Sequence, residues 1–139
     1  MKASIETSIL IDASPEKVWN TLTDFNSYPA WNPFVQRLEG NVKEGNKIMI
    51  QLPGMKFKPT VLTFAKNKKF EWLGNFLFKG IFDGNHIFEL MEKEHQTLFI
   101  HRENFSGILV KMLLKKVGKE TEEGFKKMNE ALKQRVENN

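Results

Sequence analysis

Two histidines and a glutamate in the second half of the chain are the residues whose types and spacing favour chemistry. His86 follows Asp83-Gly84-Asn85, and further along the chain His101 and Glu103 are separated by one residue. An imidazole takes or gives a proton near neutral pH, and an adjacent carboxylate can orient it. If these side chains converge, they suit enolisation, aldol cyclisation or dehydration of a bound carbonyl compound.

The same three side chains have plainer interpretations, which stay open. They satisfy one another's hydrogen bonds and fix a hairpin, or they orient a ligand without reacting with it. Two imidazoles and a carboxylate are also ligands for zinc or ferrous iron, but the sequence has no HExxH spacing or other metal signature. We therefore predict no metal site and no cofactor, and we treat His86, His101 and Glu103 only as candidates for catalysis.

A hairpin is expected to bring these residues together. The strands expected at 81–91 and 97–105 are separated by Glu92–His95. If these residues form a four-residue loop, Met91 faces Gln96 and the remaining pairs follow from the turn. That register places these pairs on one face of the sheet: His86 opposite His101, Phe88 opposite Phe99, Leu90 opposite Thr97, and Gly84 opposite Glu103.

The segment Ile9–Phe34 predicts how the chain begins. Ser4–Asp12 alternate partly and end in apolar residues, as a half-buried strand does. Ser14 is a helix N-cap, and Pro15 occupies the first helical position, where a missing N–H costs nothing. The prolines and asparagines that follow break this helix and allow one more short turn before Trp31-Asn32-Pro33-Phe34.

The middle of the chain has the pattern of an antiparallel meander. Together with the first strand, the runs between turn residues predict about seven strands that share one sheet. The further strands are expected at Val35–Glu39, Lys47–Leu52, Phe57–Ala65, Phe70–Phe78, Ile81–Met91 and Thr97–Phe105.

A long amphipathic helix is predicted for Ile108–Val136, because apolar residues recur there at mostly three- and four-residue steps. Such a helix would cover the sheet. Gly118 and Gly124 each cost about 1 kcal/mol relative to alanine in a helix interior. They are expected either to bend or weaken the helix, or to allow close packing against it.

The order of these elements resembles that of the START-like (SRPBCC) superfamily, and within it the polyketide cyclase/dehydrase-like proteins. The opening segment and two short helices come first, the strands follow, and the long helix is last. The resemblance covers nearly the whole chain. Its further motifs are Gly40-x-x-x-x-Gly45, Phe82-Asp83-Gly84-Asn85-His86-x-Phe88 and His101-x-Glu103-x-Phe105-x-Gly107. It implies an α+β helix-grip fold, in which a curved antiparallel sheet surrounds the long C-terminal helix, and the whole chain 1–139 forms one domain.

A cavity between the sheet and the last helix is the expected binding site. The chain has 12 Phe and 3 Trp, which either fill the core or form the wall of an apolar pocket. The resemblance places Trp31 near the cavity entrance, and Gly74 leaves room beside Trp72 on its strand. The predicted ligand-binding residues are Trp31, Trp72, Phe82, His86, Phe88, Phe99, His101, Glu103 and Phe105.

Composition limits the partners that we expect. The net charge is +4, but lysines alternate with glutamates along the last helix, which is typical of a solvated face and not of a nucleic-acid site. No run of apolar residues is long enough for an integral membrane segment, and the start of the chain has no signal-peptide pattern. With no cysteine, the sequence is compatible with a cytoplasmic location, which we expect.

Three functions follow from these observations. The leading hypothesis is binding of a small hydrophobic or aromatic molecule in the cavity. The second is an enzyme of the cyclase/dehydrase type that uses His86, His101 and Glu103 for acid–base chemistry. The third is a module for a protein partner, such as a chaperone activator or an antitoxin-like regulator, which would use an outer surface instead of the cavity.

Overall fold

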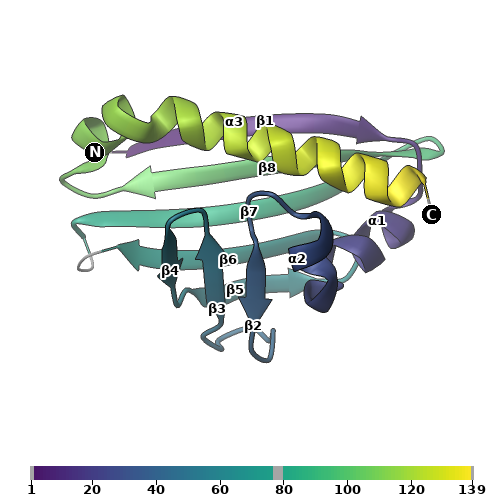
Figure 1. Ribbon diagram of the computed structural model, residues 1–139, viewed down its shortest axis with the longest axis horizontal. Coiled ribbons are helices and arrows are strands. Elements are labelled where there is room, and N and C mark those ends of the chain that lie inside the picture. The colour runs from purple at the N-terminus through teal and green to yellow at the C-terminus, as the bar shows by residue number, and fades with distance from the viewer. Residues whose placement is uncertain (1, 77–79, 139) are drawn as a thin grey trace.

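The computed structural model describes residues 2–76 and 80–138 (Figure 1). Two antiparallel sheets and a long C-terminal helix make up an α+β fold, with five strands in the order β1-β8-β7-β6-β5 and three in the order β2-β3-β4. The strands are β1 (Lys2–Ile11), β2 (Arg37–Glu39), β3 (Met49–Leu52), β4 (Met55–Phe57), β5 (Thr60–Ala65), β6 (Lys69–Phe76), β7 (Phe82–Lys93) and β8 (Gln96–Ser106). The helices are α1 (Pro15–Leu22), the 3-10 turn η1 (Phe25–Ser27), α2 (Tyr28–Trp31) and α3 (Val110–Glu137).

The predicted α+β fold is confirmed, whereas the prediction of about seven strands in one sheet is wrong in its details, because the strands form two sheets. The segment expected as one strand, Phe57–Ala65, divides into β4 and β5, and Pro59 lies at the break. Proline has no N–H to donate to a ladder, so a continuous central strand cannot pass through it. A single bridge between Lys47 and Thr60 is the pairing found there between the two sheets. The end of the predicted strand Phe70–Phe78 lies outside the described residues.

The predicted start of the chain is confirmed. The Ser14 hydroxyl accepts a hydrogen bond from the backbone N–H of Lys17 at 3.2 Å, and proline opens α1. Val18, Trp19 and Leu22 form the buried face of this helix. The short η1 and α2 follow, so the two short helices after the first strand are where the sequence predicts them.

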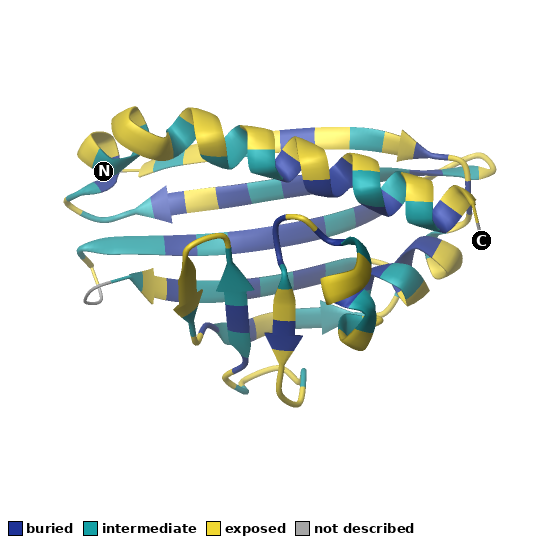
Figure 2. Cartoon of the chain, in the orientation of Figure 1, coloured by how far each residue is buried: buried dark blue, intermediate teal, exposed yellow. Residues whose placement is uncertain are grey.

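Helix α3 packs along β1 and β8, but only part of it is seated on the core (Figure 1). From Phe125 onward it buries five residues, namely Phe125, Met128, Asn129, Leu132 and Val136. Between Lys111 and Gly124 no residue is buried, although the helix is continuous. Figure 2 shows this change along α3, from exposed and intermediate residues to buried ones.

The molecule therefore has a closed end and an open end. At the closed end, α1, α2 and residues 125–136 of α3 pack with the sheet around one aromatic core that includes Trp19, Tyr28 and Phe70. The open end is defined by residues 111–124 of α3. Residues on the helix there face the sheet without being buried by it, so space remains between the two.

Candidate ligand-binding site

A cavity of about 590 Å³ lies at the open end, between α3, the β3–β4 hairpin and the large sheet. This volume lies within the usual range of ligand pockets, which is about 300–1,000 Å³. Its helix wall is formed by Leu114, Val117, Glu120, Thr121, Glu123, Gly124 and Lys127. The loop after α2 and the β3–β4 hairpin contribute Pro33, Phe34, Leu52, Pro53, Met55 and Phe57.

Aromatic side chains form most of the sheet side of this cavity. Phe57 and Phe76 lie 4.9 Å apart between ring centroids, and Phe82 stacks on Phe105 at 5.4 Å with an angle of 10°. Trp72 closes the floor and is 1% exposed. Large rigid rings of this kind hold an apolar molecule by contact area and by stacking.

Two glycines make room at this site. A Cβ at position 124 would lie 2.8 Å from Cδ1 of Phe34, so a glycine on α3 lets that ring pack against the helix. A Cβ at position 84 would collide with Oε2 of Glu103 on the neighbouring strand. Gly84 therefore gives the carboxylate its place on the cavity wall.

The hairpin of β7 and β8 has a different register from the predicted one. Lys93 pairs with Gln96, so the loop consists of Glu94 and His95, with Glu94 at φ 58°. His86 consequently lies opposite Glu103, Phe88 opposite His101, Leu90 opposite Phe99, and Gly84 opposite Phe105. The prediction is wrong by two residues. Because side chains alternate with a period of two, a shift of two residues leaves every one of them on the predicted face.

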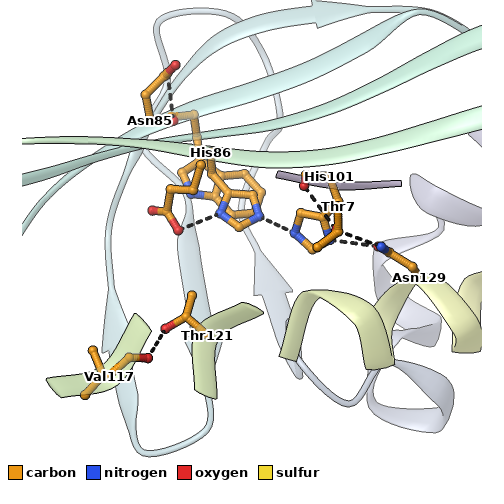
Figure 3. Close-up of polar contacts among 9 residues, drawn as sticks. Thr7, Asn85, His86, His101, Val117, Thr121 and Asn129 are labelled. Atoms are coloured by element: carbon orange, nitrogen blue, oxygen red, sulfur yellow. Dashed lines mark hydrogen bonds and ion pairs between the residues drawn. The ribbon is translucent and has the colours of Figure 1, made fainter. Parts of the chain in front are cut away.

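The two histidines and Glu103 do converge, and they belong to a longer series of polar contacts, the polar chain (Figure 3). Nδ1 of His86 lies 3.3 Å from Oε1 of Glu103, and Nε2 of His86 lies 2.8 Å from Nε2 of His101. Nδ1 of His101 lies 2.9 Å from Oδ1 of Asn129 on α3. Nδ2 of Asn129 donates to Oγ1 of Thr7 at 2.8 Å, and that hydroxyl donates to the backbone carbonyl of His101 at 3.2 Å.

The direction of the polar chain is fixed at its far end. A carbonyl oxygen only accepts, so Thr7 must donate to it and must accept from the amide N–H of Asn129. The Oδ1 of Asn129 therefore accepts the proton on Nδ1 of His101. Neutral His101 then accepts at Nε2, which requires His86 to donate from its own Nε2.

Nδ1 of His86 faces Oε1 of Glu103 at the cavity end of the polar chain, 3.3 Å away, and both residues line the cavity. The polar chain thus joins a carboxylate on the cavity wall to the core between the sheet and α3.

Burial controls the protonation of His101. Its side chain has no exposed surface, and loss of solvation is the main reason why its pKa falls well below the ordinary value of 6.5. Charge on His86 lowers the pKa further, while the hydrogen bond to Asn129 opposes the shift. Phe125 stacks on the ring at 4.0 Å with an angle of 10°, and Trp72 stacks on His86 at 4.6 Å with an angle of 12°.

Not every predicted residue lies at the cavity. Trp72, Phe82, His86, Glu103 and Phe105 line it, whereas Trp31, Phe88, Phe99 and His101 do not. Phe88 and Phe99 are core residues with 1% and 0% exposure. Trp31 packs on Tyr28 at 5.4 Å and against the core of the closed end, so it joins the short helices to the body of the protein.

Sequence reasoning missed several residues of the polar chain and of the cavity wall. Thr7 shares the inward positions of β1 with Ile5, Ile9 and Ile11, and Asn129 interrupts the apolar stripe of α3 between Phe125 and Leu132. A polar residue at an inward position was the available signal in both cases. The part of the wall formed by the β3–β4 hairpin had no comparable signal, because its place over the sheet depends on tertiary packing.

Within residues 2–76 and 80–138, no group of three or more His, Cys, Asp or Glu residues has a geometry that could hold a metal ion. Over the same residues, no helix is both long and apolar enough to cross a membrane.

Comparison with known proteins identifies the family. The sequence model of the family described as "Polyketide cyclase / dehydrase and lipid transport" matches residues 2–137. Among curated proteins, none matches this sequence.

Several solved structures have a similar fold. The hypothetical protein jhp0584 from Helicobacter pylori has a TM-score of 0.81 and 16% identity, with 96% of this chain and 88% of that chain covered. Protein MLL2253 from Mesorhizobium loti has a TM-score of 0.77 and 18% identity, with 98% of each chain covered. A norcoclaurine synthase point mutant from Thalictrum flavum, in complex with a transition state analogue, has a TM-score of 0.74 and 12% identity, with 99% and 96% covered.

Proposed function

The chain belongs to the family of polyketide cyclases, dehydrases and lipid-transport proteins, and we propose that it binds a small, mostly apolar or aromatic molecule between α3 and the sheet. The observation that carries this proposal is the cavity of about 590 Å³ with aromatic walls. Above the cavity, no residue of α3 between 111 and 124 is buried, although these residues make up half of the helix. An apolar ligand would supply the burial that this half of the helix lacks.

Native mass spectrometry of the freshly purified protein, beside a denatured sample of the same preparation, tests the proposal. We expect a small molecule that stays bound in the native spectrum and leaves on unfolding. Apolar aromatic compounds added to the stripped protein should raise its melting temperature, and the rise should grow with the ratio of ligand concentration to dissociation constant. A clean native mass together with an unchanged melting temperature across such compounds would contradict the proposal.

A second candidate is acid–base catalysis of the cyclase/dehydrase type, and the pair His86–Glu103 is the observation that favours it. The two residues lie 3.3 Å apart and line the cavity, so a bound carbonyl compound would meet a carboxylate able to take a proton. The polar chain behind them holds His86 in one orientation.

Ligand binding and catalysis predict different effects of a conservative substitution at Glu103. For an enzyme, Glu103→Gln should lower turnover of a bound β-hydroxyketone, which loses its α-proton and β-hydroxyl group as water, by about a hundredfold or more and change its affinity little. The readout is loss of one water from the substrate, followed by mass spectrometry. A binding protein would leave the substrate mass unchanged in both wild type and variant.

A further inference from the structure

The one free oxygen of Glu103 specifies what the ligand must carry, and this inference rests on the proposed function. Glu103 is 7% exposed, and its Oε1 lies 3.3 Å from Nδ1 of His86. In the part of the chain that the structure describes, no donor reaches Oε2, which lies against Gly84. A buried carboxylate oxygen without a partner costs free energy once the water beside it is displaced.

The geometry makes Oε2 the oxygen that is available to a ligand. Oε1 faces Nδ1 of His86 at 3.3 Å, and a carboxylate oxygen only accepts hydrogen bonds. Both nitrogens of His86 are already used inside the polar chain, so its ring meets a ligand only through carbon atoms.

Most of the other polar side chains in the cavity wall also accept hydrogen bonds. Thr121 donates its hydroxyl hydrogen to the backbone carbonyl of Val117 at 3.0 Å (Figure 3), which leaves its oxygen to accept. Glu120 and Glu123 are exposed carboxylates at the helix side of the cavity. The donors among the wall side chains are the indole N–H of Trp72 and the ammonium group of Lys127, and the latter is exposed at the mouth.

We propose that the cavity selects flat apolar molecules that carry a hydrogen-bond donor, such as a phenol or hydroxyl group, and that Oε2 of Glu103 accepts this hydrogen bond. A ligand whose only polar atom is an ether or ketone oxygen leaves Oε2 unpaired and binds more weakly. Aromatic rings on Trp72, Phe82 and Phe105 hold the apolar body of the ligand, while Glu103 fixes which end points inward.

Two matched pairs of probes separate the contribution of the hydrogen-bond donor from that of the apolar body. We would titrate the protein with 1-hydroxypyrene and 1-methoxypyrene, and with the smaller pair 2-naphthol and 2-methoxynaphthalene, by fluorescence and calorimetry. The phenols should bind at least about tenfold more tightly than their methyl ethers, because a hydrogen bond to a carboxylate is stronger than one between neutral groups.

Variants assign this preference to Glu103. Glu103→Leu should reduce the ratio of the two affinities to about one. Glu103→Gln should keep part of the preference, since its N–H₂ can donate to Nδ1 of His86 while its oxygen still faces the ligand. Glu122→Gln is the matched control, because Glu122 pairs with Lys126 outside the cavity at 3.5 Å and should leave the ratio as in the wild type. Melting temperatures establish that each variant is folded.

The outcomes are distinguishable. Equal affinities for phenol and ether in the wild type, or a preference that survives in Glu103→Leu, would overturn this inference while leaving the proposed function in place. Failure of both members of both pairs to bind the wild-type protein would contradict the proposed function, and the inference would fall with it.

Discussion

His101 shows how one buried side chain sets the state of its neighbours. It has no exposed surface, its pKa is well below the ordinary value, and its two ring nitrogens join Asn129 to His86. A neutral ring with its proton on Nδ1 is the form that suits these partners. This tautomer requires His86 to donate from Nε2, so it fixes the orientation of the ring that faces Glu103 at the cavity.

The lowered pKa of His101 predicts that the protein loses stability in mild acid. Below the ordinary histidine pKa of 6.5 the unfolded chain binds a proton at position 101 that the folded chain does not bind. The free energy of unfolding should therefore fall by about 1.4 kcal/mol for each further pH unit from this group, until the depressed pKa is reached. Urea unfolding between about pH 7.5 and pH 5 measures this slope.

The comparison variants for this prediction are His101→Gln and His95→Gln. The first should have a shallower dependence of unfolding free energy on pH than the wild type, even if it is less stable at every pH. The second changes an exposed histidine in the β7–β8 turn and should keep the wild-type slope. Parallel pH profiles for the wild type and His101→Gln would refute the assignment.

At the scale of elements, α3 is one continuous helix that performs two tasks. Its second half is seated on the core, and its first half spans the cavity. The two glycines that the sequence marks as bends or packing sites lie in this first half. Gly124 allows close packing of Phe34, whereas a Cβ at Gly118 would meet nothing closer than Leu114 Cβ at 3.7 Å.

The two glycines should therefore respond in opposite ways to the same substitution. Gly118→Ala should stabilise the protein by about 1 kcal/mol, since alanine is the better helix former and its methyl group finds ordinary contacts. Gly124→Ala should destabilise it by about 1–3 kcal/mol, because the new methyl group displaces the ring of Phe34. Chemical denaturation of both variants beside the wild type measures the difference.

Gly124→Ala also reports on the cavity, since Phe34 lies in its wall. Affinity for 1-hydroxypyrene should change in this variant and stay unchanged in Gly118→Ala. If both variants gained stability equally, the contact between α3 and Phe34 would not be as close as the structure has it.

At the scale of the whole molecule, the packed core and the cavity both lie between α3 and the sheet, toward opposite ends of the helix. The closed end supplies the buried apolar surface that a chain of 139 residues needs to fold. The open end is then free to keep space that side chains do not fill. Filling that space should therefore remove binding without unfolding the protein.

Leu114→Trp tests this division. Leu114 lines the cavity and is only partly buried, so a larger ring there should enter the cavity and lower affinity for 1-hydroxypyrene at least about tenfold. The melting temperature should stay within a few degrees of the wild type, because the core at the closed end is untouched. Fluorescence titration and thermal unfolding give the two readouts.

Met112→Trp is the matched control on the same helix. Met112 is 58% exposed and is not among the lining residues, so its replacement should leave affinity unchanged. Equal loss of binding in both variants would mean that the ligand does not occupy the described cavity.

Local sequence patterns determined much of this protein. The N-cap at Ser14, the buried face of α1, the long C-terminal helix and the inward face of β7 and β8 all follow from capping chemistry and from periods of 3.6 and 2. The same patterns brought His86, His101 and Glu103 to one face, because any even shift in register preserves the face.

Tertiary structure alone decided the remainder. The pairing of His86 with Glu103 depends on the loop of β7–β8 having two residues, a choice that turn propensity leaves open. Which aromatic rings fill the core and which line the cavity depends on where α3 leaves the sheet, and Thr7 reaches Asn129 from the opposite end of the chain. Periodicity encodes which way a side chain points, but contacts between distant segments arise only when the elements pack together.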